Sequence, residues 1–149
     1  MFEYFEPNKM LKKYTRGRYK GKPKHASDCV VRCFAKAWGV DWRTAAERLF
    51  TKAMEIQRIP DEEDCWKSFL QPSDKSQFVT KYGCRNGVWG DHKYYITVAE
   101  FAESTKGTRT KYILNCPQHL VCASNGKYYD AWDSGRLTVR KIFILKESK

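Results

Sequence analysis

The sequence predicts an α+β fold in a single domain, with helices packed on one face of an antiparallel sheet. Apolar residues recur at helical spacing through the first half of the chain, and strand-like alternation dominates the second half. Helices first and strands last are typical of this fold class. At 149 residues, one core is able to bury roughly two thirds of the unfolded surface.

The first helix is predicted from Cys29 to Trp38. Asp28 or Ser27 would cap its N-terminus, because short polar side chains accept hydrogen bonds from the free N–H groups of a first turn. Gly39 would end the helix, since glycine adopts the left-handed conformation found after many helix C-termini.

Two more helices are expected next. Asp41 caps the second, which runs to about Met54, and a third follows the break at Pro60 and ends near Leu70. Residues 71–96 show no clear pattern. Helical spacing predicts one buried stripe on the second helix: Trp42, Ala45, Ala46, Leu49, Phe50, Ala53 and Met54.

A capping box from Thr97 to Glu100 predicts a fourth helix that ends near Ser104. The pattern then changes to strands. The dipeptide Asn125-Gly126 predicts a two-residue hairpin turn between two of them. The expected strands cover residues 110–114, 120–124, 127–132 and 137–145.

Residues 1–26 are predicted to form a basic arm with little regular structure, ahead of a domain over residues 27–149. The whole chain carries a net charge of +11. Such an arm is suited to binding an acidic protein or a nucleic acid, and a solvated arm without a partner is the alternative. The arm contains no acid between Pro7 and Ser27, where eight basic residues lie: Lys9, Lys12, Lys13, Arg16, Arg18, Lys20, Lys22 and Lys24.

Neither a membrane span nor a bound metal is expected. No apolar run approaches the ~18 residues that a span requires, and the first residues lack the basic-then-apolar order of a signal peptide. We therefore expect a cytoplasmic protein with reduced cysteines. Cys116, His119 and Cys122 have spacings found among zinc ligands, but the second half of such a site is missing, so we expect no metal.

Three residues, named here the triad, suit thiol-based covalent catalysis: Cys29, His119 and Asp130. Cys29 stands at the expected helix start, where partial positive charge favours a thiolate. A histidine activates such a thiol, and a carboxylate orients the histidine. Taken singly, each residue has an ordinary structural interpretation, such as a small buried cysteine. Together they predict a nucleophile, a general base and an orienting carboxylate.

The predicted hairpin turn decides which carboxylate faces the histidine. Opposed residues share a face, so His119, Asp130 and Trp132 project together and Asp133 projects to the opposite face. Asp130 is therefore the expected partner, and Asp133 is the reserve if the strand contains a bulge. The turn predicts five pairs: Ser124 with Lys127, Ala123 with Tyr128, Cys122 with Tyr129, Val121 with Asp130 and His119 with Trp132.

One stretch of the chain reads Ser27-Asp28-Cys29-Val30-Val31-Arg32-Cys33-Phe34-Ala35 and is followed by Gly39 and a second amphipathic helix. It resembles the nucleophile helix of the papain-like cysteine peptidases, in particular small bacterial and phage forms related to bacteriocin leader peptidases. The C-terminal half carries the rest of the resemblance: Thr97-Val-Ala-Glu-Phe101, Gly107 before a strand, His119-Leu-Val, the Asn-Gly turn and Tyr129-Asp130-Ala-Trp132-Asp133.

The resemblance implies a papain-like fold and the same three roles for the triad. The family also places a polar side chain a few residues before the cysteine, where it helps to stabilise an oxyanion. Here residues 22–28 contain no Gln or Asn. Lys24, His25 or Ser27 would take that role, beside the backbone N–H of Cys29.

The predicted function is cysteine-dependent acyl transfer of the peptidase, isopeptidase or amidase type, acting without a cofactor on a protein or peptide. Trp89 and Trp132 are the candidate substrate contacts. Deamidation and transamidation use the same residues, so the sequence does not choose among them. The alternative is a catalytically inactive papain-like protein that binds or inhibits a nucleic acid or an acidic partner. If a phage encodes the chain, its place is the host cytoplasm.

Overall fold

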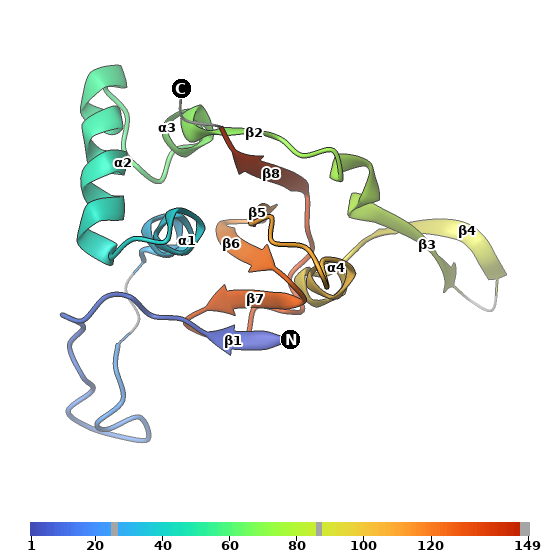
Figure 1. Ribbon diagram of the computed structural model, residues 1–149. Helices are drawn as coiled ribbons and strands as arrows, with labels where there is room; N and C mark the ends of the chain where they lie inside the picture. The colour runs from blue at the N-terminus through green and yellow to red at the C-terminus, as the bar shows by residue number, and fades with distance from the viewer. Residues whose placement is uncertain (25–26, 86–87, 147–149) are drawn as a thin grey trace.

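A six-stranded sheet forms the centre of the protein (Figure 1). The computed structural model describes residues 1–24, 27–85 and 88–146, and for residues 77–78, 82–85 and 88–92 it describes the backbone alone. The strand order is β1-β7-β6-β5-β8-β2, in which only the β1–β7 pair is parallel. The strands are β1 (Phe2–Tyr4), β2 (Leu70–Pro72), β5 (Tyr112–Cys116), β6 (His119–Ser124), β7 (Lys127–Asp130) and β8 (Lys141–Leu145).

Helices cover both faces of this sheet. On one face, α1 (Cys29–Trp38) lies against β6, and α2 (Trp42–Ile56) packs on α1. α4 (Val98–Ser104) packs on the other face, so the expectation that all helices share one face is wrong. The reason is that the central strands are apolar on both sides: Ile113 and Cys122 face α1, whereas Leu114, Val121 and Ala123 join the cluster of α4.

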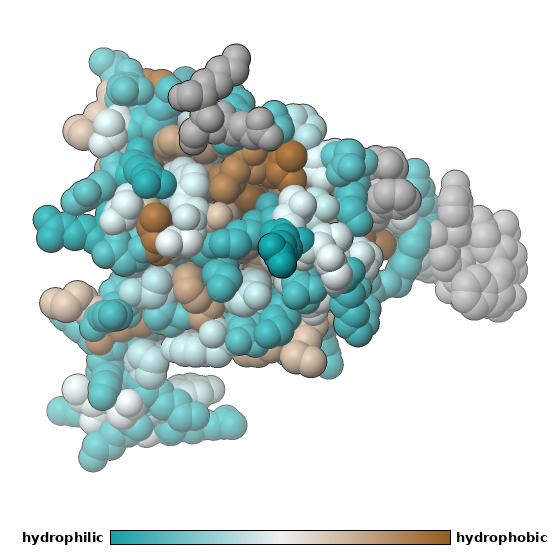
Figure 2. Space-filling model, viewed as in Figure 1, coloured by the Kyte–Doolittle hydropathy of each residue, from teal (hydrophilic) through white to brown (hydrophobic). Residues whose placement is uncertain are grey.

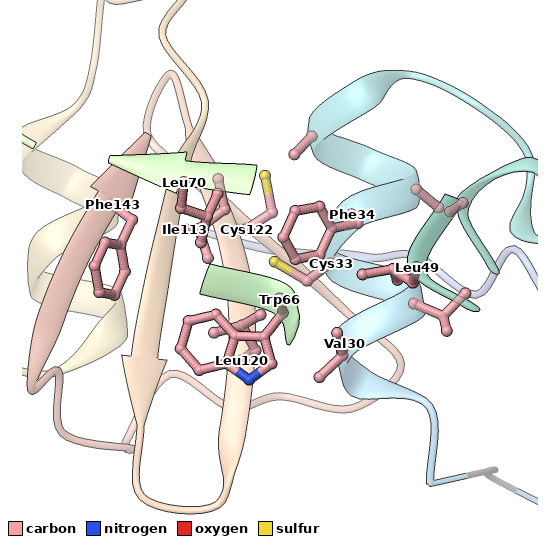
Figure 3. Close-up of a cluster of buried hydrophobic side chains, with 14 of the residues drawn as sticks. Val30, Cys33, Phe34, Leu49, Trp66, Leu70, Ile113, Leu120, Cys122 and Phe143 are labelled. Atoms are coloured by element: carbon pink, nitrogen blue, oxygen red, sulfur yellow. The ribbon is translucent and has the colours of Figure 1, made fainter. Parts of the chain in front are cut away.

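The core beneath α1 is a continuous apolar cluster (Figure 3). Phe34 is fully buried in it, and its ring contacts those of Trp38 and Phe69 at centroid distances of 4.7 and 5.8 Å. Trp66 of α3 (Glu63–Trp66) and Phe143 of β8 belong to the same cluster, and their rings contact each other. Burial of each large apolar side chain stabilises the folded state by roughly 1.5–3 kcal/mol, so this cluster fixes α1 on the sheet.

The ends of α1 follow the prediction at one terminus and depart from it at the other. Gly39 ends the helix in the left-handed conformation with φ of 68°. Asp28 occupies the N-cap position, but its carboxylate makes no capping hydrogen bond. It is held instead by Arg32 and the indole N–H of Trp42. The N-terminus of α1 is thus shaped by buried polar contacts rather than by a conventional cap.

The second and third helices differ from their predicted extent. Asp41 caps α2 as expected by accepting from the backbone N–H of Thr44 at 2.8 Å. Phe50 and Met54, predicted to be buried, are 50% and 73% exposed, because the sheet and α1 cover only the Leu49 side of the helix. α3 is short, and Leu70 already belongs to β2, where it pairs with β8.

The predicted fourth helix and the hairpin turn are present. Thr97 and Glu100 form both hydrogen bonds of the capping box at the start of α4. Asn125 and Gly126 have φ of 49° and 80°, the left-handed values that a tight hairpin turn requires. β3 (Thr80–Arg85) and β4 (Val88–Tyr95) form a separate two-stranded sheet in the segment that carried no clear pattern.

The first residues of the chain are more regular than predicted. β1 adds to the edge of the main sheet beside β7, so residues 2–4 are part of the fold. Residues 9–24 form the projecting loop of the basic arm, which a bridge between Lys13 and Pro23 closes. Figure 2 shows this loop as a hydrophilic projection. Among the residues described, no helix combines the length and apolar character that crossing a membrane requires.

Candidate active site

The fold brings the three residues of the triad to one end of the sheet. Cys29 is the first residue of α1, His119 begins β6 and Asp130 ends β7. His119 Nε2 lies 2.6 Å from Oδ2 of Asp130. Of the five predicted pairs of the hairpin, the three nearest the turn are present in the predicted register. The other two, Val121 with Asp130 and His119 with Trp132, are not pairs of the β6–β7 ladder. Asp133 lies elsewhere, where its carboxylate accepts from the Tyr128 hydroxyl at 2.5 Å.

His119 joins the other two members of the triad. Its Nε2 faces Asp130, and both the Asp130 carboxylate and the Cys29 side chain favour the charged imidazole. Burial disfavours that form, but the interactions with Asp130 and Cys29 outweigh burial and raise the pKa of His119 to about 9. The imidazole is therefore protonated at neutral pH.

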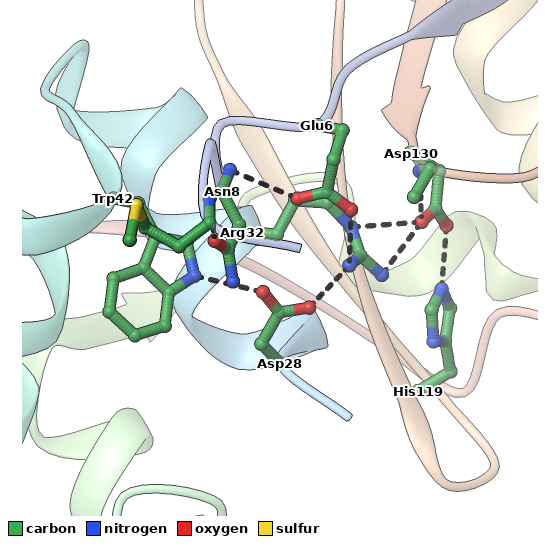
Figure 4. A network of polar contacts seen from close by, with 9 residues as sticks. Glu6, Asn8, Asp28, Arg32, Trp42, His119 and Asp130 are labelled. Atoms are coloured by element: carbon green, nitrogen blue, oxygen red, sulfur yellow. Dashed lines mark hydrogen bonds and ion pairs between the residues drawn. The ribbon is translucent and has the colours of Figure 1, made fainter. Parts of the chain in front are cut away.

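Asp130 is a buried carboxylate whose two oxygens have different partners. Its side chain is 1% exposed. Oδ1 accepts from the Ala131 N–H at 2.8 Å and from the Arg32 guanidinium, and Oδ2 faces His119 (Figure 4). Burial would raise the pKa of Asp130, but the hydrogen bond from His119 and the charges of His119 and Arg32 lower it. Asp130 is accordingly a carboxylate anion at neutral pH.

Arg32 is the centre of a polar network that the sequence analysis missed. Its side chain, 4% exposed, lies one turn into α1 and contacts Asp28, Glu6 and Asp130. Figure 4 shows the guanidinium between these three carboxylates, with His119 beyond Asp130. Two signals were available: Asp28 and Arg32 have the i,i+4 spacing of a helical ion pair, and Arg32 is a charge within an apolar run.

A cavity of about 560 Å³ opens at the triad. Cys29, half-buried, lines it together with His119 and Trp132. The Trp132 ring is 42% exposed and lies 5.0 Å from the imidazole ring of His119, measured between centroids. Trp132, predicted as a substrate contact, thus lies beside His119. Trp89, the other predicted contact, lies on β4, and its side chain is outside the described part of the chain.

The polar side chains near Cys29 differ from those expected. Ser27 lines the cavity, but the ammonium of Lys24 lies over the Tyr14 ring in the basic arm, and His25 is outside the described residues. Two residues with amide side chains also line the cavity, namely Asn115 and Gln118. Gln118 directly precedes His119 with φ of 55°, in the turn between β5 and β6.

The other described thiols are buried and differ from Cys29 in their surroundings. Burial raises the pKa of Cys116 and Cys122 to about 12, and it raises that of Cys33 well above its usual range. Cys116 and Cys122 belong to clusters on opposite faces of the sheet, so they cannot share a metal ion with His119. Within the described ranges, no three His, Cys, Asp or Glu side chains are grouped as metal ligands.

Comparison with known proteins adds no assignment. No protein-family model, no curated protein and no solved structure matches the chain.

Proposed function

We propose that the protein is a cysteine-dependent acyl-transfer enzyme of the peptidase, isopeptidase or amidase type, built on a papain-like fold. One observation carries the proposal. His119 lies 2.6 Å from Asp130 and lines one cavity together with Cys29, the first residue of α1, whose side chain helps to raise the pKa of the imidazole. This order of nucleophile, base and orienting carboxylate is the arrangement that covalent catalysis by a thiol requires.

The first half of the reaction would form an acyl-enzyme. The Cys29 thiolate attacks the carbonyl carbon of an amide or ester, and the electron pair of the C=O bond moves onto its oxygen. The free backbone N–H groups of the first turn of α1 lie beside that oxyanion, and Gln118 is the nearest amide side chain in sequence to the base. His119 donates its Nδ1 proton to the leaving nitrogen or oxygen as the bond to carbon breaks, which leaves a thioester on Cys29.

The second half would regenerate the thiolate. Neutral His119 accepts a proton from water, or from an incoming amine, through Nδ1 as that nucleophile attacks the thioester carbonyl. The C–S bond then breaks, and Cys29 returns as a thiolate beside protonated His119. Asp130 keeps its charge throughout and holds Nε2 of the imidazole in place, so the same nitrogen serves both steps.

A chromogenic ester tests the proposal without knowledge of the natural substrate. Mixing the protein with p-nitrophenyl acetate should release a burst of p-nitrophenolate, with the acetyl group found on Cys29 by peptide mapping. A Cys84→Ser background restricts the assay to the five thiols whose surroundings are described. Cys29→Ala should abolish the burst, and His119→Ala should slow it.

Cys33→Ala is the matched control, because Cys33 lies one turn further along the same helix but is buried, with a raised pKa. This variant should keep the burst once its folding has been verified by circular dichroism. A burst that persists in Cys29→Ala, or an acetyl group found mainly on another thiol, would contradict the proposed function.

The basic arm supports a second function, the binding of a nucleic acid, which is compatible with catalysis. All eight of its basic side chains are exposed on the projecting loop. Tyr14 and Tyr19, 39% and 51% exposed, lie on the same loop with ring centroids 5.9 Å apart. Exposed rings among cations are the combination by which single strands are bound, through stacking and phosphate contacts.

Fluorescence anisotropy with a labelled single-stranded oligonucleotide tests this second function. Affinity should fall by about tenfold or more between about 50 and about 300 mM salt, because binding releases counterions. Replacing Lys12, Lys13, Arg16 and Arg18 with Gln should weaken binding and flatten the salt dependence. Binding that does not respond to salt or to these substitutions would count against the second function.

A further inference from the structure

The partners of Arg32 and Asp130 point to a role for the arginine in catalysis. Arg32 directs Nε and Nη2 to the same oxygen of Asp130, Oδ1, at 3.2 and 3.0 Å. The Ala131 N–H donates to that oxygen as well, at 2.8 Å. With Oδ1 fixed by three N–H groups, the carboxylate has one orientation, and in that orientation Oδ2 faces His119 at 2.6 Å.

Other buried groups in turn hold the arginine. Nη1 of Arg32 donates to Oδ1 of Asp28 at 2.7 Å and lies 3.7 Å from Oε2 of Glu6. The second oxygen of Asp28 accepts from the Trp42 indole N–H at 2.8 Å. The guanidinium is therefore held by Asp28, which Trp42 of α2 fixes in turn, and by Glu6 of the N-terminal segment. These contacts keep its planar fork directed at Asp130.

The backbone adds a second attachment at the same point. The Phe5 N–H donates to the carbonyl oxygen of Asp130 at 2.8 Å, immediately after β1 pairs with β7. Glu6, the next residue, reaches Arg32. The N-terminal segment thus contacts both residues that determine where the imidazole of His119 lies.

We propose that Arg32 is a positioning residue, which fixes the Asp130 carboxylate so that His119 is held and charged beside Cys29. The proposal rests on the proposed function, since it assigns a part in the same site. Arg32 need not touch the substrate to act, because its effect passes through Asp130 to the imidazole. A lysine cannot replace it, since an ammonium group lacks the planar fork that reaches Asp28 and Asp130 together.

The Arg32→Lys variant tests the proposal through the titration of His119, followed by NMR of its ring. Loss of the fixed carboxylate should lower the pKa of His119 from about 9 by about one unit or more. The rate of Cys29 alkylation by iodoacetamide at neutral pH should fall by about tenfold. Arg43→Lys is the matched control: Arg43 also pairs with a carboxylate through Nε, at 3.1 Å, but at the surface, and this variant should leave both values unchanged.

A folded Arg32→Lys variant with an unchanged His119 titration would overturn the proposal, whatever its effect on thermal stability. The unchanged protein provides a measurement that does not depend on the folding of a variant. Because Arg32 and His119 share the Asp130 carboxylate, the Arg32 Nε–H resonance should shift with the same midpoint as His119. If the chemical shift of the Arg32 Nε–H group does not change as His119 titrates, the proposal is overturned as well. Slow alkylation of Cys29 in the unchanged protein would instead count against the proposed function.

Discussion

His119 and Asp130 face each other across two adjacent strands, with Nε2 of the imidazole 2.6 Å from Oδ2 of the carboxylate. The contact depends on the hairpin register, which brings Asp130 to His119. Three residues further on, Asp133 is tied to the Tyr128 hydroxyl and to the Gly135 N–H. Asp130 and Asp133 are close in sequence but have different hydrogen-bond partners. Replacing each in turn with Asn therefore compares the same chemical change at a residue that contacts His119 and at one that does not.

Asp130→Asn should slow Cys29 alkylation and acetylation, whereas Asp133→Asn should leave both rates near those of the unchanged protein. An amide at position 130 removes the negative charge that stabilises protonated His119, and we expect both rates to fall by about tenfold or more.

The same change leaves Arg32 with one carboxylate fewer in a buried site and should lower the free energy of unfolding by about 3–5 kcal/mol. Rates are therefore compared under conditions where circular dichroism shows both variants folded. A larger loss of rate in Asp133→Asn would reverse the assignment.

Stability should depend on pH through His119. Its pKa is about 9 in the folded protein against an ordinary value of 6.5, so its contribution is fully present below about pH 6.5 and is lost as the pH rises through about 9. The pKa of Asp130 is lowered, so its contribution is present above the ordinary value of 3.8 and is lost as the pH falls through the lower folded-state value.

Urea unfolding of the protein and of a His119→Gln variant measures the histidine contribution. The difference in unfolding free energy between the two should shrink by on the order of 2 kcal/mol between about pH 6 and about pH 9.5. A difference that stays constant across this range would show that the imidazole does not gain a proton on folding.

Gln118→Ala should separate acyl transfer from simple thiol reactivity. Alkylation by iodoacetamide forms no oxyanion, so its rate should stay within about twofold, while the acetylation burst with p-nitrophenyl acetate should slow by about tenfold or more. Asn115→Ala is the control, because Asn115 lines the same cavity without adjoining the base in the chain. If both reactions slow equally in Gln118→Ala, the glutamine affects the thiol or the fold and is not an oxyanion donor.

Phe34→Ala and Phe50→Ala should differ sharply in stability. Phe34 is 0% exposed, so truncation leaves a cavity and should cost about 3–5 kcal/mol. Phe50 is 50% exposed on α2, and its truncation should cost less than about 1 kcal/mol. Chemical denaturation of both variants checks this, and equal losses would mean that the exposed face of α2 is covered in solution.

Local chemistry predicted several elements closely. The bounds of α1 match because an apolar helical stripe ends at a glycine that adopts positive φ. The Asn-Gly turn has one preferred geometry, and from it followed the pairing that brings Asp130 rather than Asp133 to His119. The burial of Phe50 was misjudged, because periodicity identifies an apolar stripe but not how much of it a neighbour covers.

The sequence alone was enough to predict the contact between His119 and Asp130 and the α+β class, because a tight turn and the alternation of strand residues are properties of neighbouring residues. The folded chain was needed to place α4 opposite α1 and to bring Arg32 to Asp130, a partner 98 positions away. It was needed equally to bring Gln118 to the cavity of Cys29. These relations arise from the packing of both faces of the sheet and from the pairing of buried charges, and no local pattern encodes which distant partners will meet.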